Sequence, residues 1–363
     1  MNDTTLLVTG GAGFVGSNLV RAALDRGARR IVVVDNLISA ERENVPDDER
    51  VELVEGSIAD DAVLAQVGAE FDYVFHLATY HGNQSSIANP LEDHANNLIT
   101  TLKLFEHLKG PRRLRKLVYS ASGCTLAPHE VYDEAEATQE DGPVPLDLDS
   151  PYQISKVVGE FYAVYYHRMD GLPTVRARFQ NIYGPREILG AGRWRGTPAT
   201  VWRNVTPTFV YRALKGLPLV VDGGGDASRD FVYVGDVVDG LLLCATDGTA
   251  GDVYNLASGV DTTVAALAEL ANELAGSDVP VEYGPRRPWD HSIKRFGATE
   301  KAKSELGFEA KVELRDGLER TVEWTRANLE LIDRCIARHA EEMARAGSPV
   351  DELVSPPLST TGP

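Results

Sequence analysis

A tyrosine and a lysine four residues apart are the side chains best placed for proton transfer in this sequence of 363 residues. Ser150 and Pro151 precede them and are typical of the first positions of a helix. Tyr152 and Lys156 are therefore predicted to share one helix face. A nearby ammonium group favours the ionised phenol and lowers its pKa. The pair predicts a base that takes a proton from a hydroxyl group near neutral pH.

The same spacing arises by chance in many amphipathic helices, so the catalytic interpretation needs further support. A short apolar run that ends in Tyr119-Ser120-Ala121-Ser122 is predicted to be a strand. Its end could place Ser122 beside Tyr152. The serine and a glycine-rich segment nearer the N-terminus together favour catalysis over a purely structural pair.

This glycine-rich segment predicts a dinucleotide site. Residues 6–9 read as a strand, and Gly10, Gly13 and Gly16 follow at the start of a helix. Glycines let the backbone approach a pyrophosphate, whose charge is stabilised at the helix N-terminus. Asp35 ends the next predicted strand, where a carboxylate would bind ribose hydroxyls and repel a 2′-phosphate. The pattern favours NAD over NADP.

The elements that position these residues alternate along the chain. Short β-branched runs at 6–9, 30–35, 51–55, 73–77, 116–120 and 174–179 are separated by helical patterns. This order predicts an α/β fold of the Rossmann type, with a doubly wound parallel sheet. After residue 180 the pattern changes to shorter elements and Gly/Pro-rich loops, which predicts a smaller α/β substrate-binding lobe.

We expect an NAD-binding domain at 1–180 with a return segment near 232–258, and a substrate-binding lobe at 181–231 and 259–330. One last helix is predicted over about 314–345, so that 331–347 forms its C-terminal end, before a disordered tail at 348–363.

Composition limits the possible partners. The formal net charge is -18, which argues against binding to nucleic acid or to an anionic membrane. The three cysteines have no spacing typical of a disulfide framework or a zinc site, and His81 and His94 lack metal-ligand spacing. No export signal is evident. We expect a cytoplasmic protein without a metal.

These motifs together resemble the extended short-chain dehydrogenase/reductases of the NAD-dependent epimerase/dehydratase family. The resemblance covers about residues 5–328 and rests on 9–16 (TGGAGFVG), 76–78 (HLA), Ser122, Tyr152 with Lys156, 181–186 (NIYGPR), 229–233 (RDFVY) and 301–307 (KAKSELG). It implies that Tyr152 is the acid/base, that Lys156 tunes it and orients the nicotinamide ribose, and that Ser122 binds the reacting hydroxyl.

The resemblance also implies a set of binding residues. The implied NAD contacts are Gly10, Gly13, Phe14, Val15, Gly16, Asp35, Asn36, Ser57, Ile58, Leu77, Ala78, Thr79, Asn97, Tyr152, Lys156 and Gln180. Ser57 stands where the family usually has an aspartate that contacts adenine. The predicted contacts to a nucleoside-diphosphate sugar are Gln84, Ser122, Asn181, Arg195, Asn204, Val221, Arg229 and Arg287. Family practice, with paired helices near 96–109 and 152–168, implies a homodimer.

The residues after Ser122 narrow the reaction that the resemblance implies. Related 4,6-dehydratases have an Asp-Glu pair there and uronate decarboxylases a glutamate, whereas this chain has Gly123 and Cys124. Oxidation at C4 and return of the hydride to the opposite face, as in 4-epimerases, is therefore favoured. Cys124 leaves open a 3- or 5-epimerase, or a 3,5-epimerase, in which a thiol is the acid/base. A non-catalytic NAD-binding regulator is a third possibility.

A basic segment at 186–206 stands out in so acidic a chain, with four arginines and one acid. Arginine suits recognition of diphosphates. We expect this segment to cover an unusual sugar as a lid, and that sugar could carry a negative charge of its own.

Overall fold

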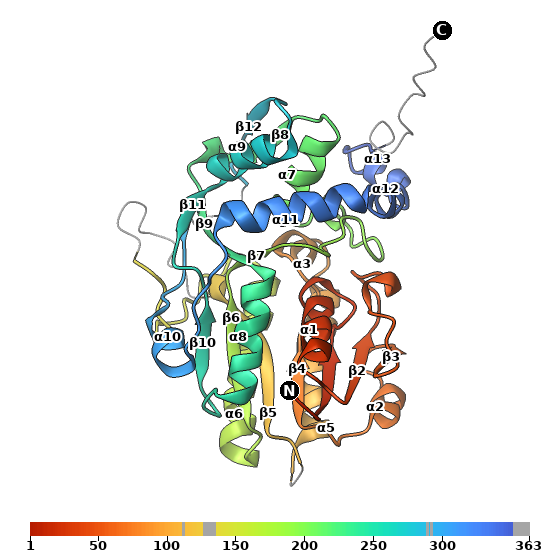
Figure 1. Ribbon diagram of the computed structural model, residues 1–363, viewed down its shortest axis with the longest axis vertical. Coiled ribbons are helices and arrows are strands. Elements are labelled where there is room, and N and C mark those ends of the chain that lie inside the picture. The colour runs from red at the N-terminus through yellow and green to blue at the C-terminus, as the bar shows by residue number, and fades with distance from the viewer. Residues whose placement is uncertain (111–112, 126–135, 288–289, 291–292, 351–363) are drawn as a thin grey trace.

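A parallel sheet of seven strands forms the centre of the larger lobe. The computed structural model describes residues 1–110, 113–125, 136–287, 290 and 293–350, without the side chain of Cys124. The sheet order is β3-β2-β1-β4-β5-β6-β10, which confirms the predicted doubly wound α/β fold (Figure 1). The strands are β1 (Thr5–Thr9), β2 (Arg30–Asp35), β3 (Val51–Glu55), β4 (Tyr73–His76), β5 (Lys116–Ser122), β6 (Thr174–Phe179) and β10 (Val253–Leu256).

Both faces of this sheet are covered because apolar side chains alternate along buried strands. Leu6 and Val8 of β1 pack into one cluster with α1 (Phe14–Asp25) and α8 (Val234–Thr246). Leu7 points the other way, into a cluster with α2 (Asp61–Val67), α5 (Thr100–Leu108) and α6 (Pro151–Asp170). Figure 1 shows α1 and α8 in front of the sheet and α5 and α6 behind it. The same view shows that the carboxyl ends of the strands point toward the smaller lobe.

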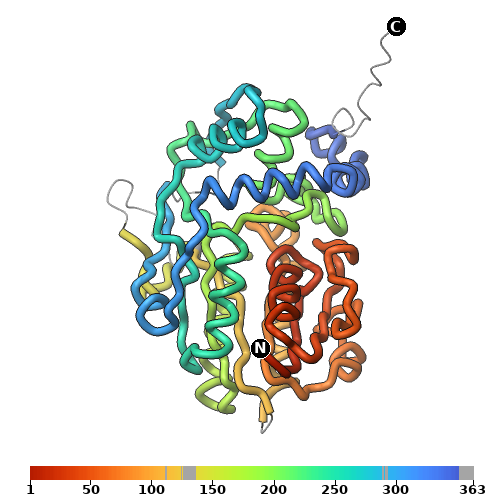
Figure 2. The backbone as a smooth tube through the Cα atoms, in the orientation of Figure 1, coloured from red at the N-terminus to blue at the C-terminus, as the bar shows by residue number. Residues whose placement is uncertain are grey.

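Among the described residues, two short sheets and a group of helices form the smaller lobe. In one sheet β9 (Ser228–Tyr233) pairs with β7 (Asn181–Tyr183), β11 (Asp261–Thr263) and β13 (Lys294–Arg295). In the other, β8 (Leu219–Asp222) pairs with β12 (Val281–Gly284). Helices α7 (Val205–Leu214), α9 (Val264–Ala275) and α11 (Leu314–Ala327) share one apolar cluster, and Figure 2 shows their backbones close together.

The chain crosses between the lobes more often than the predicted boundaries allow. Helix α8 and strand β10 lie in the larger lobe, in the expected return region. Helix α10 (Glu300–Leu306) was assigned to the smaller lobe, but its Ala302 and Leu306 lie in the core shared by α1 and α8. An amphipathic helix does not reveal by sequence which lobe receives its apolar face.

The predicted last helix is divided into three. Helix α11 ends at Ala327, and α12 (Leu329–Ala337) and α13 (Ala340–Arg345) follow it. The break occurs at Asn328, whose φ of -121° and ψ of 20° are not helical. Val350 is buried in a cluster with α12 and α13, so the packed part of the chain extends into the tail that was predicted to be disordered. The remainder of that tail, 351–363, lies outside the described residues.

Candidate functional site

The glycine turn between β1 and α1 leaves room for a phosphate group. Gly10 has a φ of +74°, and a Cβ atom there would lie 2.6 Å from the backbone nitrogen of Ala78. Helix α1 begins at Phe14, and no side chain caps it at Gly13. The first N–H groups of a helix have no partner within the helix and favour negative charge. This part of the chain therefore fits the pyrophosphate of a dinucleotide.

Asp35 lies at the carboxyl end of β2, as predicted, with its carboxylate fixed by the backbone. Its two oxygens accept hydrogen bonds from Ala12 N at 3.0 Å and Leu37 N at 2.9 Å. Burial raises the pKa of Asp35, while these backbone N–H groups act in the opposite direction. Each carboxylate oxygen has a second lone pair that can accept from a ribose hydroxyl. The geometry therefore fits an adenosine ribose.

A cavity of about 650 Å³ extends from this turn to the smaller lobe. Its lining includes fifteen of the predicted cofactor residues: Gly10, Gly13, Phe14, Val15, Gly16, Asp35, Asn36, Ser57, Ile58, Leu77, Ala78, Thr79, Tyr152, Lys156 and Gln180. It has the size usual for small-molecule sites. The arrangement fits an extended dinucleotide along the ends of the strands.

Asn97, the remaining predicted cofactor contact, lies behind the cavity wall. Its Oδ1 accepts from Tyr80 N at 2.7 Å and Thr79 Oγ1 at 3.0 Å, and its Nδ2 donates to Asp93 at 2.7 Å. Asn97 therefore stabilises the loop after β4 and does not line the cavity. Its long-range partners could not be read from the sequence.

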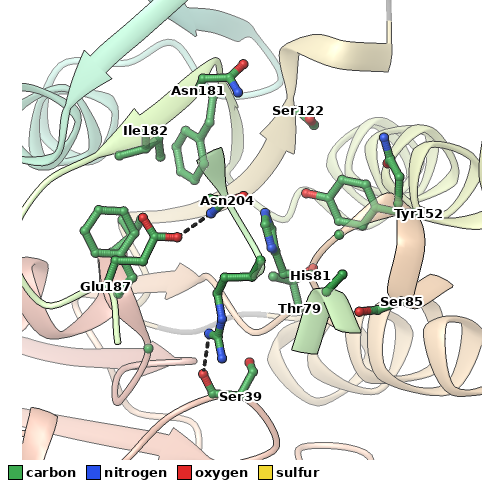
Figure 3. A pocket seen from close by; sticks show the side chains of 18 of the residues that line it. Ser39, Thr79, His81, Ser85, Ser122, Tyr152, Asn181, Ile182, Glu187 and Asn204 are labelled. Atoms are coloured by element: carbon green, nitrogen blue, oxygen red, sulfur yellow. Dashed lines mark hydrogen bonds between the residues drawn. The ribbon is translucent and has the colours of Figure 1, made fainter. Parts of the chain in front are cut away.

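Tyr152 and Lys156 lie on α6, which begins at Pro151 as predicted, with Ser150 accepting a hydrogen bond from Gln153 N. The ammonium group of Lys156 donates to Ser120 O at 2.9 Å and lies 5.9 Å from the centre of the Tyr152 ring. Tyr152, Lys156 and Ser122 all line the cavity. Figure 3 shows the Tyr152 hydroxyl pointing into it. The arrangement can move a proton at a bound hydroxyl group.

Cys124 follows Ser122 on the chain, in a short 3-10 helix formed by Gly123–Thr125. Its side chain lies outside the described part of the structure. A role for the Cys124 thiol stays a prediction.

His81 lines the cavity, although it was considered in the sequence only as a possible metal ligand. Its ring packs edge-on against Tyr152, with ring centres 5.8 Å apart. Burial lowers its pKa to about 3, and the positive charges of Arg195, Arg203 and Lys156 act in the same direction. The imidazole is therefore neutral at pH 7 and can both donate and accept hydrogen bonds. The sequence did contain a signal for this role, because His81 lies in the loop after β4, and loops at the carboxyl end of a parallel sheet commonly bind ligands.

Five of the predicted substrate residues line the part of the cavity toward the smaller lobe: Gln84, Asn181, Asn204, Arg229 and Arg287. Two of their cations are held by carboxylates. Arg229 contacts Asp290 at 2.9 Å, and Arg287 pairs with Asp222. The arginines are thus positioned before any ligand binds.

Arg195 and Val221 do not line the cavity, in contrast to the prediction. The Arg195 side chain is 2% exposed, and its Nη1 donates to the backbone oxygen of His81 at 2.8 Å. Val221 has no exposed surface and packs in the core of the smaller lobe, whereas its neighbour Val220 lines the cavity. Successive strand residues point to opposite faces, so an error of one position moves a side chain from the site into the core.

The basic segment 186–206 forms a braced wall of the cavity and not a loosely attached lid. Arg203 donates to Ser39 O at 2.9 Å and Ala191 O at 2.8 Å, and Arg193 N donates to Ile38 O at 3.0 Å. Ile188, Leu189, Ala191 and Val201 are buried with α12 and α13. The segment therefore joins the loop after β2 to the C-terminal helices.

Two further properties concern membranes and metals. Among the described residues, no helix is both long and apolar enough to cross a membrane. The part of the chain that the structure describes also contains no cluster of three or more His, Cys, Asp or Glu side chains that could hold a metal ion.

Comparison with known proteins agrees with this geometry. The structure of the Bordetella bronchiseptica enzyme WbmF in complex with NAD+ and UDP has 57% sequence identity to this chain and a TM-score of 0.85, covering 95% of this chain and 98% of that one. The UDP-glucose 4-epimerase of Mycolicibacterium smegmatis is 32% identical and covers 88% of this chain and 98% of its own length. UDP-glucuronic acid decarboxylase 1 of Arabidopsis thaliana is 33% identical, over 87% of this chain and 68% of its own length.

The model of the NAD dependent epimerase/dehydratase family matches residues 6–257. This range contains the glycine turn, Asp35, Ser122, Tyr152 and Lys156. The prediction of NAD as the cofactor is confirmed at the level of the family. With a dinucleotide cradle and a Tyr/Lys pair in one cavity, and with this match, the chain belongs to the NAD-dependent epimerase/dehydratase family.

Proposed function

We propose that the protein is an NAD-dependent nucleotide-sugar 4-epimerase. The observation that carries this proposal is the single cavity that joins the glycine turn, Tyr152 and the asparagines and arginines of the smaller lobe. A nucleotide sugar would place its diphosphate near the arginines and its sugar near Tyr152. The relatives support a nucleotide sugar, because WbmF was crystallised with UDP and several others act on UDP-sugars.

The side chains of this cavity would carry out the proton transfers. Tyr152 takes the proton from the C4 hydroxyl as that carbon is oxidised to a ketone, and returns it when the ketone is reduced from the opposite face. Lys156 favours the ionised tyrosine, and Ser122 hydrogen-bonds the C4 oxygen. NAD, when bound, supplies the acceptor and later the donor of the hydride, so none is consumed overall.

The absence of an acid after Ser122 supports epimerisation over the other reactions of the relatives. Dehydration and decarboxylation in this family were expected to use carboxylates at the positions of Gly123 and Cys124. Besides Asp35, the cavity nevertheless contains a buried acid, Glu187, which lies on the opposite side from Ser122 in Figure 3. A uronate decarboxylase or a dehydratase would release a product that the experiment below detects.

A second candidate is an epimerase at C3 or C5. Cys124 follows Ser122 by two residues, in a short 3-10 helix, and the neutral His81 lies against Tyr152. A ketone at C4 acidifies the C–H bonds at C3 and C5, so that a thiol could remove and return a proton there. A third candidate, a non-catalytic NAD-binding regulator, needs none of these side chains.

Incubation with UDP-, dTDP-, GDP- and CDP-sugars in deuterated water separates the candidates. Epimerisation at C4 without deuterium uptake supports the proposal, and uptake at C3 or C5 that disappears in Cys124→Ala supports the second candidate. Loss of CO₂ or of water from the sugar would overturn both. Retention of full biological function by Tyr152→Phe would indicate a regulator.

We also propose that two copies of the chain pair through α6. Ile154, Phe161 and Tyr165 recur at helical spacing on this helix and are exposed, as is Leu91 on α4 (Pro90–His94). A contiguous apolar patch on a helix typically marks an interface. Helix α6 corresponds to one of the two helices, near 96–109 and 152–168, through which the family resemblance implies a homodimer.

A further inference from the structure

Glu187 is a buried acid within the cavity whose hydrogen bonding is incomplete. The side chain is 4% exposed and lines the cavity beside Asn204. Its Oε1 accepts a hydrogen bond from Asn204 Nδ2, drawn as a dashed line in Figure 3, whereas its buried Oε2 has no partner in the structure. Buried polar atoms without a partner are uncommon in folded proteins and need an explanation.

In the part of the chain that the structure describes, no cation is hydrogen-bonded to this carboxyl group. Arg203 acts on Glu187 through its charge, which lowers the pKa of the carboxyl group. The guanidinium is instead bound to the backbone oxygens of Ser39 and Ala191. Glu187 is thus free to change its protonation state without breaking an ion pair.

We infer that Glu187 is a positioning residue that sets which edge of the Asn204 amide faces the nucleotide sugar. An ionised Glu187 can only accept, so Asn204 must turn Nδ2 toward it and present Oδ1 to the ligand. A protonated Glu187 can donate to Oδ1, which turns Nδ2 toward the ligand. The inference rests on the proposed function, because it takes the ligand beside Asn204 to be a nucleoside diphosphate.

The two states differ in what they bind. The Nδ2 edge donates to an anionic oxygen, as a diphosphate requires, and the neutral acid beside it does not repel the anion. The Oδ1 edge accepts only from N–H or O–H groups and stands next to a negative charge. Burial raises the pKa of Glu187 to about 7, while Asn204 and Arg203 oppose that shift. Both states are therefore populated near neutral pH.

The direction of the pH effect follows from this pairing. The state that binds diphosphate well contains one more proton, so affinity rises as the pH falls through the pKa of Glu187 and levels off below it. One charge-assisted hydrogen bond gained or lost corresponds to about a tenfold change in dissociation constant.

Binding of UDP-glucose to the NAD-loaded protein at pH 6, 7 and 8 tests the inference by calorimetry. The parent for all variants is Tyr152→Phe, which prevents turnover. UDP-glucose is a suitable probe because its phosphates do not titrate in this range. We expect the dissociation constant to rise about tenfold from pH 6 to pH 8 in the parent, and to be independent of pH after Glu187→Gln.

Glu140→Gln is the matched control. Glu140 is also buried with a raised pKa, but its Oε1 accepts from Asn255 N and it does not line the cavity. This variant should keep the pH dependence of the parent. If Glu187→Gln does not fold, Asn204→Ala should weaken binding at pH 6 and remove the pH dependence.

Two results would overturn the inference. If the parent binds UDP-glucose equally at all three pH values, or if Glu187→Gln keeps the tenfold change, Glu187 does not control Asn204, and the nucleotide-sugar site stands. If the parent binds no UDP-glucose at any pH, the inference fails, and turnover of the UDP-, dTDP-, GDP- and CDP-sugars decides separately whether the proposed nucleotide-sugar function fails as well. A lower unfolding temperature with unchanged pH dependence would show a purely structural role.

Discussion

Arg338, which follows α12, donates hydrogen bonds of 2.7 and 3.1 Å to the carboxylate of Glu41 in the loop after β2. Glu41 also accepts from Gly192 N at 2.9 Å, so three distant segments meet at one carboxylate. Burial alone would raise the pKa of Glu41, but Arg338 and Gly192 hold it below its usual value. The cavity wall formed by segment 186–206 is therefore bound both to the loop after β2 and to the C-terminal helices.

Arg338→Ala should lower the free energy of unfolding by about 1–2 kcal/mol, because a nearly buried carboxylate loses its cation. Chemical denaturation at pH 7 measures this change. Arg345→Ala is the control, since Arg345 and Glu341 form an exposed pair one helical turn apart, expected to contribute less than about 0.5 kcal/mol. Equal effects of the two substitutions would contradict the role of Arg338 as a fastener.

Lys156→Met should lower kcat by about 10²- to 10⁴-fold and move the pH optimum upward. Without the ammonium group, ionisation of Tyr152 becomes less favourable, so more alkaline solution is needed to form the base. Steady-state rates from pH 6 to 10 measure both effects. Lys103→Met removes a surface cation that pairs with Asp61 and should leave rate and profile unchanged. A fall in kcat without any shift of the profile would argue against tuning of Tyr152 by Lys156.

Asp35→Ala should weaken NAD binding by about 10- to 100-fold, since the charge-assisted hydrogen bonds that we expect between its carboxylate and the adenosine ribose would be lost. The same change should reduce discrimination against NADP, because the acid that repels the 2′-phosphate is gone. Calorimetric titration of cofactor-free protein gives both affinities. Glu52→Gln removes an exposed acid on the neighbouring strand that pairs with Arg30 and does not line the cavity, and should leave both affinities as they are. Tight NAD binding by Asp35→Ala would exclude this ribose contact.

Phe161→Glu should convert the proposed dimer to a monomer, because charge on an apolar helix face cannot be buried without a partner. Sedimentation velocity at micromolar concentration distinguishes the two states. Tyr283→Glu places the same charge at another exposed aromatic position, on β12, and should not change the sedimentation coefficient. A monomeric parent protein would refute pairing through α6.

Local patterns in the sequence predicted the features that depend on local chemistry. The glycine turn, the acid at the end of β2 and the Ser150-Pro151 start of α6 were found where expected, because turns, strand ends and helix caps have residue preferences of their own. The strand alternation likewise predicted the large sheet.

Features that depend on distant contacts could not be predicted. Asn97 was expected to touch NAD, but its partners on the loop after β4 withdraw it from the cavity wall. The bracing of segment 186–206 depends on Glu41 and Arg338, which are far apart in sequence. Val221 was predicted to contact the substrate but faces the core, whereas its neighbour Val220 faces the cavity, because successive side chains of a strand point to opposite sides.

The late return of the chain to the larger lobe has a consequence for synthesis on the ribosome. The apolar face of the sheet on which α1 packs is fully covered only when α8 packs beside it. Phe308, which follows α10, lies in the same core. A nascent chain of the first 230 residues therefore has six of the seven strands, but the part of the sheet that α8 covers is still exposed to water. Until more than three hundred residues have emerged, the growing polypeptide carries a surface that chaperones recognise and that favours aggregation.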